Sequence, residues 1–274
     1  MSDILISVIV TTYNWPEALR VVLRALFCQT HKNFEIIVAD DGSTEKTQQL
    51  LIDMQKRAPV PLHHVYQPNQ GFRAAAIRNK ASLKARGDTL LFLDGDCIPP
   101  SNFIEQHLAL RTPGYFVAGN RILLSQAFTV KVLSEDLRIE TWPFWRWMVA
   151  WLKGHCNRIL PWLRLPLGHL RYLRPKRWRG AMGCHLAIWR KDLLRINGWE
   201  EKFEGWGYED SDLVIRLIQA GIKRKEARFS VPLLHLWHPF YSRDKASDNW
   251  ERLLKRQKCL QDPRSEQGLN QYEF

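Results

Sequence analysis

The stretch "LLFLDGDCIPP", from Leu90 to Pro100, decides how this chain folds. It begins as an apolar run that is typical of a buried β-strand. The run ends at Asp94-Gly95-Asp96, where a single glycine separates two carboxylates. Carboxylates held this close repel each other unless a positive group lies between them. The stretch therefore predicts a strand that delivers two acids to a cation.

Strands and helices alternate on the N-terminal side of this stretch. Strand-like runs occupy residues 4–13, 33–41, 62–67 and 88–94. Helical spacing occupies residues 17–29, 43–57 and 71–86, with Pro16 in the first turn of the first helix, Ser43 or Thr44 as the second cap, and Gly71 opening the third. The alternation predicts an α/β fold with a Rossmann-like, mainly parallel sheet flanked by helices.

Polar sequences follow three of these strands. They are Thr12-Tyr13-Asn14, Asp40-Asp41-Gly42-Ser43 and Asp94-Gly95-Asp96. Ligands of parallel sheets bind beyond the carboxyl ends of the strands, so we expect the three sequences to share one crevice. The second sequence also fits an Asx turn that leads into a helix.

Gly71, Arg73 and Arg78 lie at the start of the third predicted helix. Backbone N–H groups at a helix N-terminus, together with arginines, suit an anionic diphosphate. The alternative is a solvated basic helix face, and the sequence does not decide between the two for Arg73.

The composition is that of a globular protein with an excess of positive charge. The 274 residues are 45% hydrophobic, and 40 Lys and Arg against 28 Asp and Glu give a net charge of +12. Such a field favours nucleic acid, phosphorylated metabolites or acidic membranes as partners. The five cysteines contain no CxxC pair, which favours a reducing compartment. The N-terminus lacks signal-peptide features and no window approaches twenty apolar residues, so we expect a cytoplasmic protein.

Residues 131–180 differ in texture from the rest of the chain. They contain six tryptophans, and Arg138 to Arg179 contains ten Lys or Arg against one acid, Glu140. Three prolines predict short pieces instead of one long helix: Pro161, Pro166 and Pro175.

Two hypotheses explain this Trp/Arg-rich helical insertion. In the first, residues 142–179 form an amphipathic surface on the cytoplasmic face of the anionic inner membrane, because tryptophan favours the headgroup boundary and basic residues favour anionic lipid. In the second, the insertion packs on the sheet as a helical subdomain. Trp142, Trp145 and Leu152 fit a core-facing stripe in that case.

The C-terminal third predicts strand, helix, loop and helix over residues 180–221, followed by "LLHLWHPF" at 233–240. Gly205-Trp206-Gly207 suggests a shaped loop around an aromatic ring. From Asn249 the chain is polar, which predicts a helix that passes into disorder.

Five sequences, in this order and spacing, carry a resemblance to a known family. They are "SVIVTTYN" (7–14), "IIVADDGST" (36–44), "NQGFRAAAIRN" (69–79), "LFLDGDCIPP" (91–100) and "FEGWGYEDSDLVIRL" (203–217). The chain resembles the family 2 glycosyltransferases with the GT-A fold. "GWGYED" followed by "HLWH" resembles the chondroitin-polymerase and β-1,4-galactosyltransferase-like branch.

The resemblance covers residues 5–240 apart from the insertion, and it implies a domain plan. Residues 1–240 form one GT-A domain with a C-terminal acceptor-side region, and residues 241–274 form a helical tail. Residues 1–100 are the nucleotide-sugar half, and residues 101–240 are the acceptor half with the insertion at 131–180.

The implied activity is metal-dependent, inverting hexosyl transfer from a UDP-sugar to a glycan or lipid-linked glycan. In a bacterium this activity builds lipopolysaccharide core, O-antigen or capsule. The cation expected at the DXD motif is then Mn²⁺ or Mg²⁺, bound by Asp96 and carrying the donor diphosphate, with Asp94 near the ribose and the metal. The alternative is that one of these acids caps a helix near Pro100.

The resemblance also assigns the nucleotide contacts. Asp41 accepts the uracil imide N–H, and Thr12 and Tyr13 lie against the base. Gly71, Arg73 and Arg78 lie on the diphosphate.

On the acceptor side, Glu209, Asp210 and Asp212 fall in the first turn of a predicted helix, where acids are ordinary partners of the helix dipole. That explanation is sufficient for Asp212. The resemblance implies that Asp210 is the general base, that Glu209 binds an acceptor hydroxyl, and that Trp206 and Gly207 line the acceptor.

Three histidines raise separate questions. His235 and His238 would lie on opposite faces of a strand, whereas a bend would bring them together. The resemblance implies one histidine here as a metal ligand, with His238 favoured and His235 second. His185 stands where similar sequences often have asparagine, which leaves the acceptor lining and the sugar preference open.

Two other classes compete with the transferase. The charge and the basic-aromatic clustering fit a nucleic-acid-binding protein, but no zinc, RRM or helix-turn-helix pattern is present, and acids concentrate at the strand ends. We therefore expect no nucleic-acid partner. An inactive GT-A scaffold is the third class, and the acids at 94, 96 and 210 argue against it.

Overall fold

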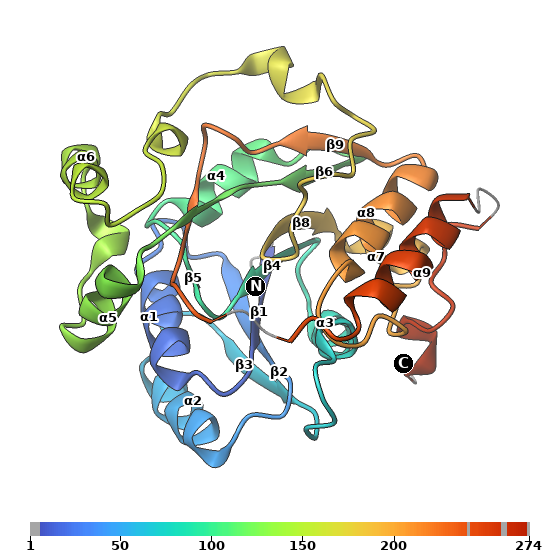
Figure 1. Cartoon of the computed structure of the whole chain (residues 1–274), viewed down its shortest axis with the longest axis horizontal. Helices are drawn as coiled ribbons and strands as arrows, with labels where there is room; N and C mark the ends of the chain where they lie inside the picture. The colour runs from blue at the N-terminus through green and yellow to red at the C-terminus, as the bar shows by residue number, and fades with distance from the viewer. Residues whose placement is uncertain (1–5, 240–241, 259–261, 273–274) are drawn as a thin grey trace.

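The structure is a computed structural model that describes residues 6–239, 242–258 and 262–272. Its centre is a seven-stranded sheet in the order β3-β2-β1-β4-β8-β6-β9 (Figure 1). The strands are β1 (Ile6–Thr12), β2 (Phe34–Asp40), β3 (Leu62–Tyr66), β4 (Thr89–Asp94), β6 (Tyr115–Ala118), β8 (His185–Trp189) and β9 (Lys223–Glu226). Neighbours pair in parallel except at β8, which is antiparallel to β4 and β6. The predicted mainly parallel α/β sheet is confirmed.

Helices cover both faces of the sheet because its central strands are apolar on both sides. In β1, Val8 and Val10 pack with α1, whereas Ile9 between them packs with α3. The helices are α1 (Pro16–Phe27), α2 (Glu45–Arg57), α3 (Ala74–Lys84), α4 (Phe103–Leu110), α5 (Gln126–Ser134), α6 (Phe144–Leu152), α7 (Arg190–Arg195), α8 (Glu209–Gln219) and α9 (Ala246–Lys258). Short 3₁₀ turns are η1 (Ile139–Thr141), η2 (Leu160–Trp162), η3 (Gly168–Tyr172) and η4 (Leu269–Gln271).

Two predicted helix starts need adjustment. α3 begins at Ala74 and not at Gly71, because the N–H of Arg73 donates to Asp41 before the helix starts. Thr44 is the N-cap residue of α2, but its side chain makes no capping hydrogen bond.

A second sheet of three strands crosses the end of the first. It contains β5 (Cys97–Ile98), β10 (Leu233–His235) and β7 (Arg121–Leu123), with β10 in the middle. His235 pairs with Cys97 in the β10–β5 register. This small sheet therefore places the "HLWH" sequence beside Asp96.

The Trp/Arg-rich insertion forms the short pieces that its prolines predict. α5 and α6 project beside α1, and residues 155–175 run along the edge of the molecule (Figure 1). Trp147 is fully buried and stacks on Trp162 at 4.9 Å between ring centroids. Trp145 and Leu152 are 58% and 76% exposed, so the core-facing stripe of the helical-subdomain alternative is wrong for these two residues.

The C-terminal tail is ordered beyond the helix, where disorder was predicted. After α9, residues 262–272 return to the loop that follows α7. Leu269 is buried there, and Asn197 donates from its side chain to Ser265 and Asn270. These long-range contacts, which the polar composition does not reveal, hold the tail in place.

Candidate active site

The three polar sequences at the strand ends meet, as predicted. The Asp41 N–H donates to the Thr12 carbonyl at 3.0 Å, and the Gly95 N–H donates to the Thr11 carbonyl at 2.7 Å. The Asn14 N–H donates to the Ser43 hydroxyl at 2.9 Å. The three sequences therefore lie side by side at the carboxyl edge of β1, β2 and β4.

The sequence suggested both a turn and a ligand contact for residues 40–43, and the structure gives Asp40 and Asp41 different surroundings. The Asp40 carboxylate accepts the Ser43 N–H at 2.8 Å, which is the predicted turn. Asp41 is buried, and its two oxygens accept the Gln67 amide at 2.6 Å and the Arg73 N–H at 2.8 Å. Burial raises the pKa of Asp41, against the lowering effect of the Gln67 hydrogen bond. Asp41 is thus held in one orientation at the end of β2.

The loop at residues 67–73 packs closely over this turn. A Cβ on Gly42, where φ is +89°, would lie 2.4 Å from the backbone nitrogen of Asn69. Asn69 donates to the hydroxyl of Tyr13 at 3.0 Å, and Tyr13 is 39% exposed. Thr12 is buried at the end of β1. An exposed ring and a fixed carboxylate therefore border the same space.

Asp94 and Asp96 point to different partners, because Gly95 bends the chain at the end of β4. Asp94 accepts from Arg78 at 3.1 Å. Asp96 lies 3.6 Å from His235 Nε2 and 3.3 Å from His238 Nε2. Neither acid caps α4, whose N-cap residue is Asn102, so that alternative is wrong.

The side chains of Asp96, His235 and His238 form a group that fits a divalent cation. Ligand atoms of Asp96, His235 and His238 all lie within 4.8 Å of one another. β10 ends at His235, and the bend after it brings His238 to the same carboxylate, which is the arrangement that a continuous strand would prevent. Burial lowers the pKa of His235, opposed by the Asp96 charge, which favours a neutral imidazole that can bind a metal. The Asp96 carboxylate is a ligand type that suits Mg²⁺ or Mn²⁺, and the two imidazoles are ligands of divalent transition metals.

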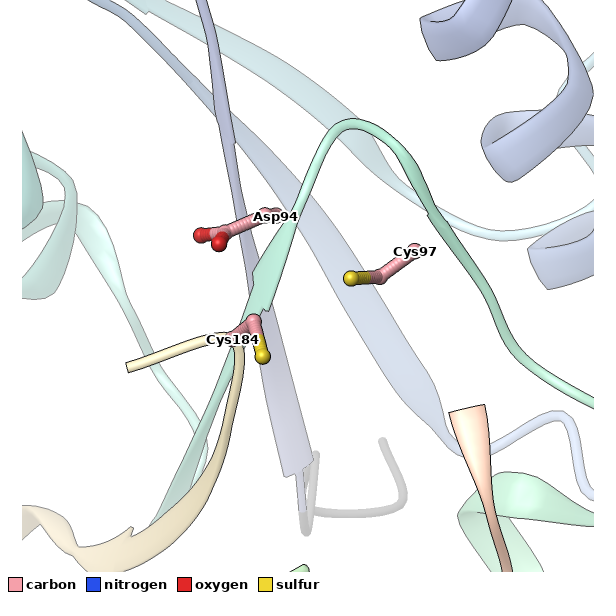
Figure 2. Close-up of side chains that lie close together, drawn as sticks. All are labelled: Asp94, Cys97 and Cys184. Atoms are coloured by element: carbon pink, nitrogen blue, oxygen red, sulfur yellow. The ribbon is translucent and has the colours of Figure 1, made fainter. Parts of the chain in front are cut away.

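A second cluster lies on the other side of the DXD bend. Figure 2 shows the side chains of Asp94, Cys97 and Cys184 converging from β4, β5 and the segment before β8. Two positive side chains contact this cluster. Arg78 pairs with Asp94, and Arg121 donates to the Cys184 sulfur at 3.7 Å. The four cysteines in the described ranges, Cys28, Cys97, Cys156 and Cys184, are free thiols.

The resemblance assigns Arg78 to the donor diphosphate, and the structure gives it partners that the sequence did not reveal. Arg78 is 4% exposed, so the alternative of a solvated helix face is wrong for it. Its guanidinium donates to Asp94 at 3.1 Å, to Glu209 at 3.2 Å and to the Thr11 hydroxyl at 3.1 Å. It also lies 4.7 Å from the Trp199 ring centroid. One buried cation therefore joins the DXD motif to the first turn of α8.

Glu209 and Asp210 begin α8 directly after a loop of left-handed residues. Gly207 and Tyr208 have φ values of +112° and +72°, which aim the first turn of the helix at Arg78. Asp210 accepts the Gly183 N–H at 3.1 Å. Burial and the neighbouring Asp210 charge raise the pKa of Glu209 to about 7, and burial also raises the pKa of Asp210. Carboxylates whose pKa values are raised by burial beside a charged neighbour are candidates for a functional site.

The loop that contains Trp206 borders this pair. Trp206 is 38% exposed, and the Arg243 guanidinium lies 4.7 Å from its ring centroid. The Gly205 N–H donates to the Phe72 carbonyl at 2.9 Å, which ties the loop to the start of α3. Gly71 and Arg73 are in that same segment, and Arg73 donates to the Pro68 carbonyl at 2.8 Å.

His185 and Asp212 have structural surroundings. His185 is fully buried, lies 3.0 Å from His107 and contacts the Asn120 carbonyl, and burial lowers its pKa to about 4. It therefore belongs to the core and does not line an open acceptor site. Asp212 is buried and paired with Arg216 at 2.7 Å, so its role is an internal ion pair as well as a helix-dipole contact.

The fold and this site define a class of protein. Residues 7–164 match the family described as "Glycosyl transferase family 2", and residues 169–238 match "N-terminal domain of galactosyltransferase". Because the first match covers more than half of the chain, the protein belongs to glycosyl transferase family 2. The predicted membership and the likeness to the galactosyltransferase branch are both confirmed.

Curated relatives and solved structures agree with this assignment. The chain is 28% identical to validoxylamine A glucosyltransferase of Streptomyces hygroscopicus subsp. jinggangensis, over 82% of this chain and 54% of that protein. It is 29% identical to the hyaluronan synthase of Pasteurella multocida, over 79% of this chain and 23% of the synthase. The chain thus spans about half or less of the length of these relatives.

Two solved glycosyltransferases confirm the GT-A fold. S. aureus TarS 1-349 in complex with UDP superposes with a TM-score of 0.60 at 14% identity, covering 92% of this chain and 65% of that one. A mannosyltransferase from Pyrobaculum calidifontis in complex with GDP-Man and Mn²⁺ gives 0.59 at 18% identity, covering 92% and 62%.

Proposed function

We propose that the protein is a metal-dependent, inverting hexosyltransferase that moves a sugar from a UDP-sugar to a glycan or lipid-linked glycan. The observation that supports this most is the pair of ion pairs made by buried Arg78. They hold Asp94 of the DXD motif and Glu209 of the acceptor-side pair in a single site. Donor and acceptor groups must meet in this way for direct transfer.

The donor side is formed by the strand ends. Asp41 accepts the uracil imide N–H, with Tyr13 and Thr12 against the base, and Asp94 faces the ribose. Gly71 and Arg73 lie toward the diphosphate. Asp96, His238 and His235 would hold Mn²⁺ or Mg²⁺, and such an ion would supply positive charge for the leaving diphosphate.

The acceptor side performs the proton transfer. Glu209 orients an acceptor hydroxyl, while Trp206 and Gly207 line the sugar that carries it. Asp210 takes the hydroxyl proton as the acceptor oxygen forms a bond to the anomeric carbon. The bond from that carbon to the diphosphate oxygen breaks on the opposite face, and its electron pair leaves with UDP. One displacement inverts the configuration at the anomeric carbon.

The relatives guide the choice of pathway. Hyaluronan and chondroitin synthases are among them, so we propose a role in building a bacterial surface polysaccharide such as lipopolysaccharide core, O-antigen or capsule. We also propose that the acceptor reaches the site at the cytoplasmic face of the inner membrane.

The test is a product assay. The purified chain is incubated with Mn²⁺, a panel of UDP-hexoses and candidate acceptors, and products are identified by mass spectrometry and by NMR of the anomeric proton. We expect one UDP-sugar to add one hexose with inverted configuration. A product of retained configuration, or turnover with GDP-sugars alone, would contradict the proposal.

A further inference from the structure

The outward face of α6 is apolar, although a surface helix ordinarily presents polar side chains to solvent. Its outward residues follow one another at helical spacing and are 58%, 44%, 42% and 76% exposed: Trp145, Met148, Val149 and Leu152. The opposite side of the helix is buried through Trp147 and Ala150. Packing on the domain is therefore complete without the outward residues.

The segment after α6 exposes more apolar side chains. Five leucines in it are more than a third exposed: Leu160, Leu163, Leu165, Leu170 and Leu173. Trp162 of η2 stacks on Trp147, which places η2 beside α6, whereas Arg171 of η3 donates to the Glu226 carbonyl at 2.8 Å, which places η3 on β9. We call the outward residues of α6, together with Leu160 and Leu163 at the two ends of η2, the apolar face. Exposed groups of this size mark interaction sites more often than the scattered apolar residues of ordinary surfaces do.

The charges within the segment that carries the apolar face have one sign. Residues 141–180 contain no Asp or Glu. Seven Lys or Arg in this segment are exposed: Arg146, Lys153, Arg158, Arg164, Arg174, Lys176 and Arg179. The nearest acid in the sequence, Glu140, is buried and paired with Arg24 at 3.2 Å, so it offsets none of them. A complementary partner must offer an apolar layer beneath an anionic one.

We propose that the apolar face docks on the surface of an anionic lipid bilayer, with α6 lying in the headgroup region. The nine residues of α6 extend roughly 14 Å, about half the thickness of a hydrocarbon core, so the helix can lie in a bilayer but cannot cross it. No helix in the described ranges has the length and apolar character that crossing a membrane requires. Tryptophan and arginine together are the residues that favour this boundary.

The basic end of the same segment leads to the acceptor side of the site. Arg224 donates to the carbonyls of Arg177 and Arg179 at 3.0 Å, which fixes the end of the basic segment on β9. Four residues after Arg179, the Gly183 N–H donates to Asp210. A lipid-linked acceptor would therefore meet Asp210 from the membrane side. This last step rests on the proposed function, whereas the docking itself does not.

Vesicle sedimentation of the full chain tests the proposal without turnover. Vesicles of phosphatidylcholine alone are compared with vesicles that also contain phosphatidylglycerol. Trp145→Ser with Leu152→Ser should weaken binding at least about tenfold, because two apolar anchors are lost. Each basic residue near an anionic surface strengthens binding about fivefold, or ~1 kcal/mol, so Arg174→Glu with Lys176→Glu should weaken it by about 25-fold or more.

Matched controls change the same chemistry elsewhere on the surface. Ile52→Ser with Tyr66→Ser removes two exposed apolar side chains from α2 and β3, and Lys56→Glu with Arg57→Glu reverses two charges on α2. Both controls should bind anionic vesicles with an affinity within twofold of that of the unmodified chain. Added salt should weaken the binding of the unmodified chain and of both controls.

Three results would overturn the proposal. One is equal recovery in the supernatant with and without anionic vesicles. Another is a loss of vesicle binding in the two controls that is as large as in the α6 variant and the Arg174/Lys176 variant. The third is a concentration-dependent dimer, seen by sedimentation velocity, that the α6 variant dissolves while no vesicle binding occurs, since a second copy would then cover the face. UDP release with a soluble acceptor, measured without vesicles, reports separately on the proposed function.

Discussion

Arg78 explains how several acids can be buried at one place. A buried carboxylate without a positive partner is costly, and Asp94, Glu209 and Asp210 would repel one another in its absence. The guanidinium offers separate N–H groups to Asp94 and Glu209, so it positions both acids at once. At the residue scale, the site is therefore a network in which Arg78 donates to Asp94 and Glu209, while Asp210 accepts the Gly183 N–H.

Asp210→Asn should retain UDP-sugar binding and lose transfer. The amide is nearly isosteric but cannot take the acceptor proton, and general-base contributions are about 10²–10⁴-fold. Steady-state kinetics should show this loss in kcat, with donor affinity from calorimetry unchanged. The control Asp53→Asn changes an exposed acid on α2 and should be neutral. A rate for Asp210→Asn within about threefold of the unmodified enzyme would exclude Asp210 as the base.

Asp96→Ala should abolish metal-dependent turnover while the fold stays intact. The variant removes the carboxylate that lies between His235 and His238, and EDTA should mimic it in the unmodified enzyme. UDP release with and without Mn²⁺ measures the effect, and circular dichroism checks the fold. Asp88→Ala, which changes an exposed acid just before β4, is the control. Full activity of Asp96→Ala would contradict the proposed metal site.

Glu209→Gln should change how stability depends on pH. The folded pKa of Glu209 is about 7, above the ordinary value of 4.5, so the unfolded chain loses this proton first as pH rises. Glu209 therefore lowers stability progressively between these two pH values. The free energy of unfolding of Glu209→Gln, relative to that of the unmodified chain, should therefore rise by roughly 2 kcal/mol from about pH 5 to about pH 8. Urea unfolding at both pH values measures this, with Glu135→Gln as an exposed control; an equal difference at both would contradict it.

At the scale of elements, the insertion uses one aromatic helix in two ways. α6 buries Trp147 against Trp162 and Trp142, while Trp145 faces outward. Both sides of this helix are apolar, so its own sequence does not specify which side is buried. Contacts with the rest of the domain decide that. The loop before α8 shows the same dependence on backbone geometry, because Gly207 and Tyr208 in left-handed conformations set the direction of the helix.

Trp147→Ala and Trp145→Ala should differ in their effect on stability. Removing fully buried Trp147 leaves a cavity and should cost about 3–5 kcal/mol of unfolding free energy. Removing Trp145, which is more than half exposed, should change it by less than about 0.5 kcal/mol. Urea denaturation of the two variants measures this. Similar losses in both would mean that the outward side of α6 is packed in solution.

At the scale of the whole molecule, the C-terminal tail joins parts that are distant in sequence. Leu269 packs beside Gly198, and the Ser265 N–H donates to the Ile196 carbonyl at 3.0 Å. The Tyr272 hydroxyl donates to Glu201, which also accepts from Asn79 of α3. The tail therefore fastens the end of α7 to α3, the helix that carries Arg78.

Gly268→Ala should loosen this tail. A Cβ at this position would lie 1.9 Å from the Asn197 carbonyl oxygen and 2.1 Å from the Ser265 hydroxyl. Overpacking of this kind costs about 1–3 kcal/mol. Thermal unfolding should show a lower midpoint and limited proteolysis should show faster cleavage near the C-terminus. Gln267→Ala, the exposed neighbour, is the control, and an unchanged midpoint for Gly268→Ala would contradict the tail's role.

The sequence by itself determined the sheet, the strand-end acids and the family. Strand and helix periods are local, and Asp94, Asp96, Asp41 and Asp210 lie at element ends that the chain marks with glycine, so their positions follow from the pattern. The DXD motif with a following "HLWH" also indicated a metal site whose side chains the structure brings together.

Only the tertiary structure decided which groups become partners. Arg78 and Glu209 are 131 residues apart, and nothing local indicates that a helix arginine will be buried between two acids. His185 stands in an acceptor-like motif but is buried against His107, because β8 turns it toward the core. The side of α6 that packs, and the docking of a polar tail, likewise depend on contacts between distant segments. Burial and ion pairing are properties of the assembled chain, and therefore no local pattern specifies them.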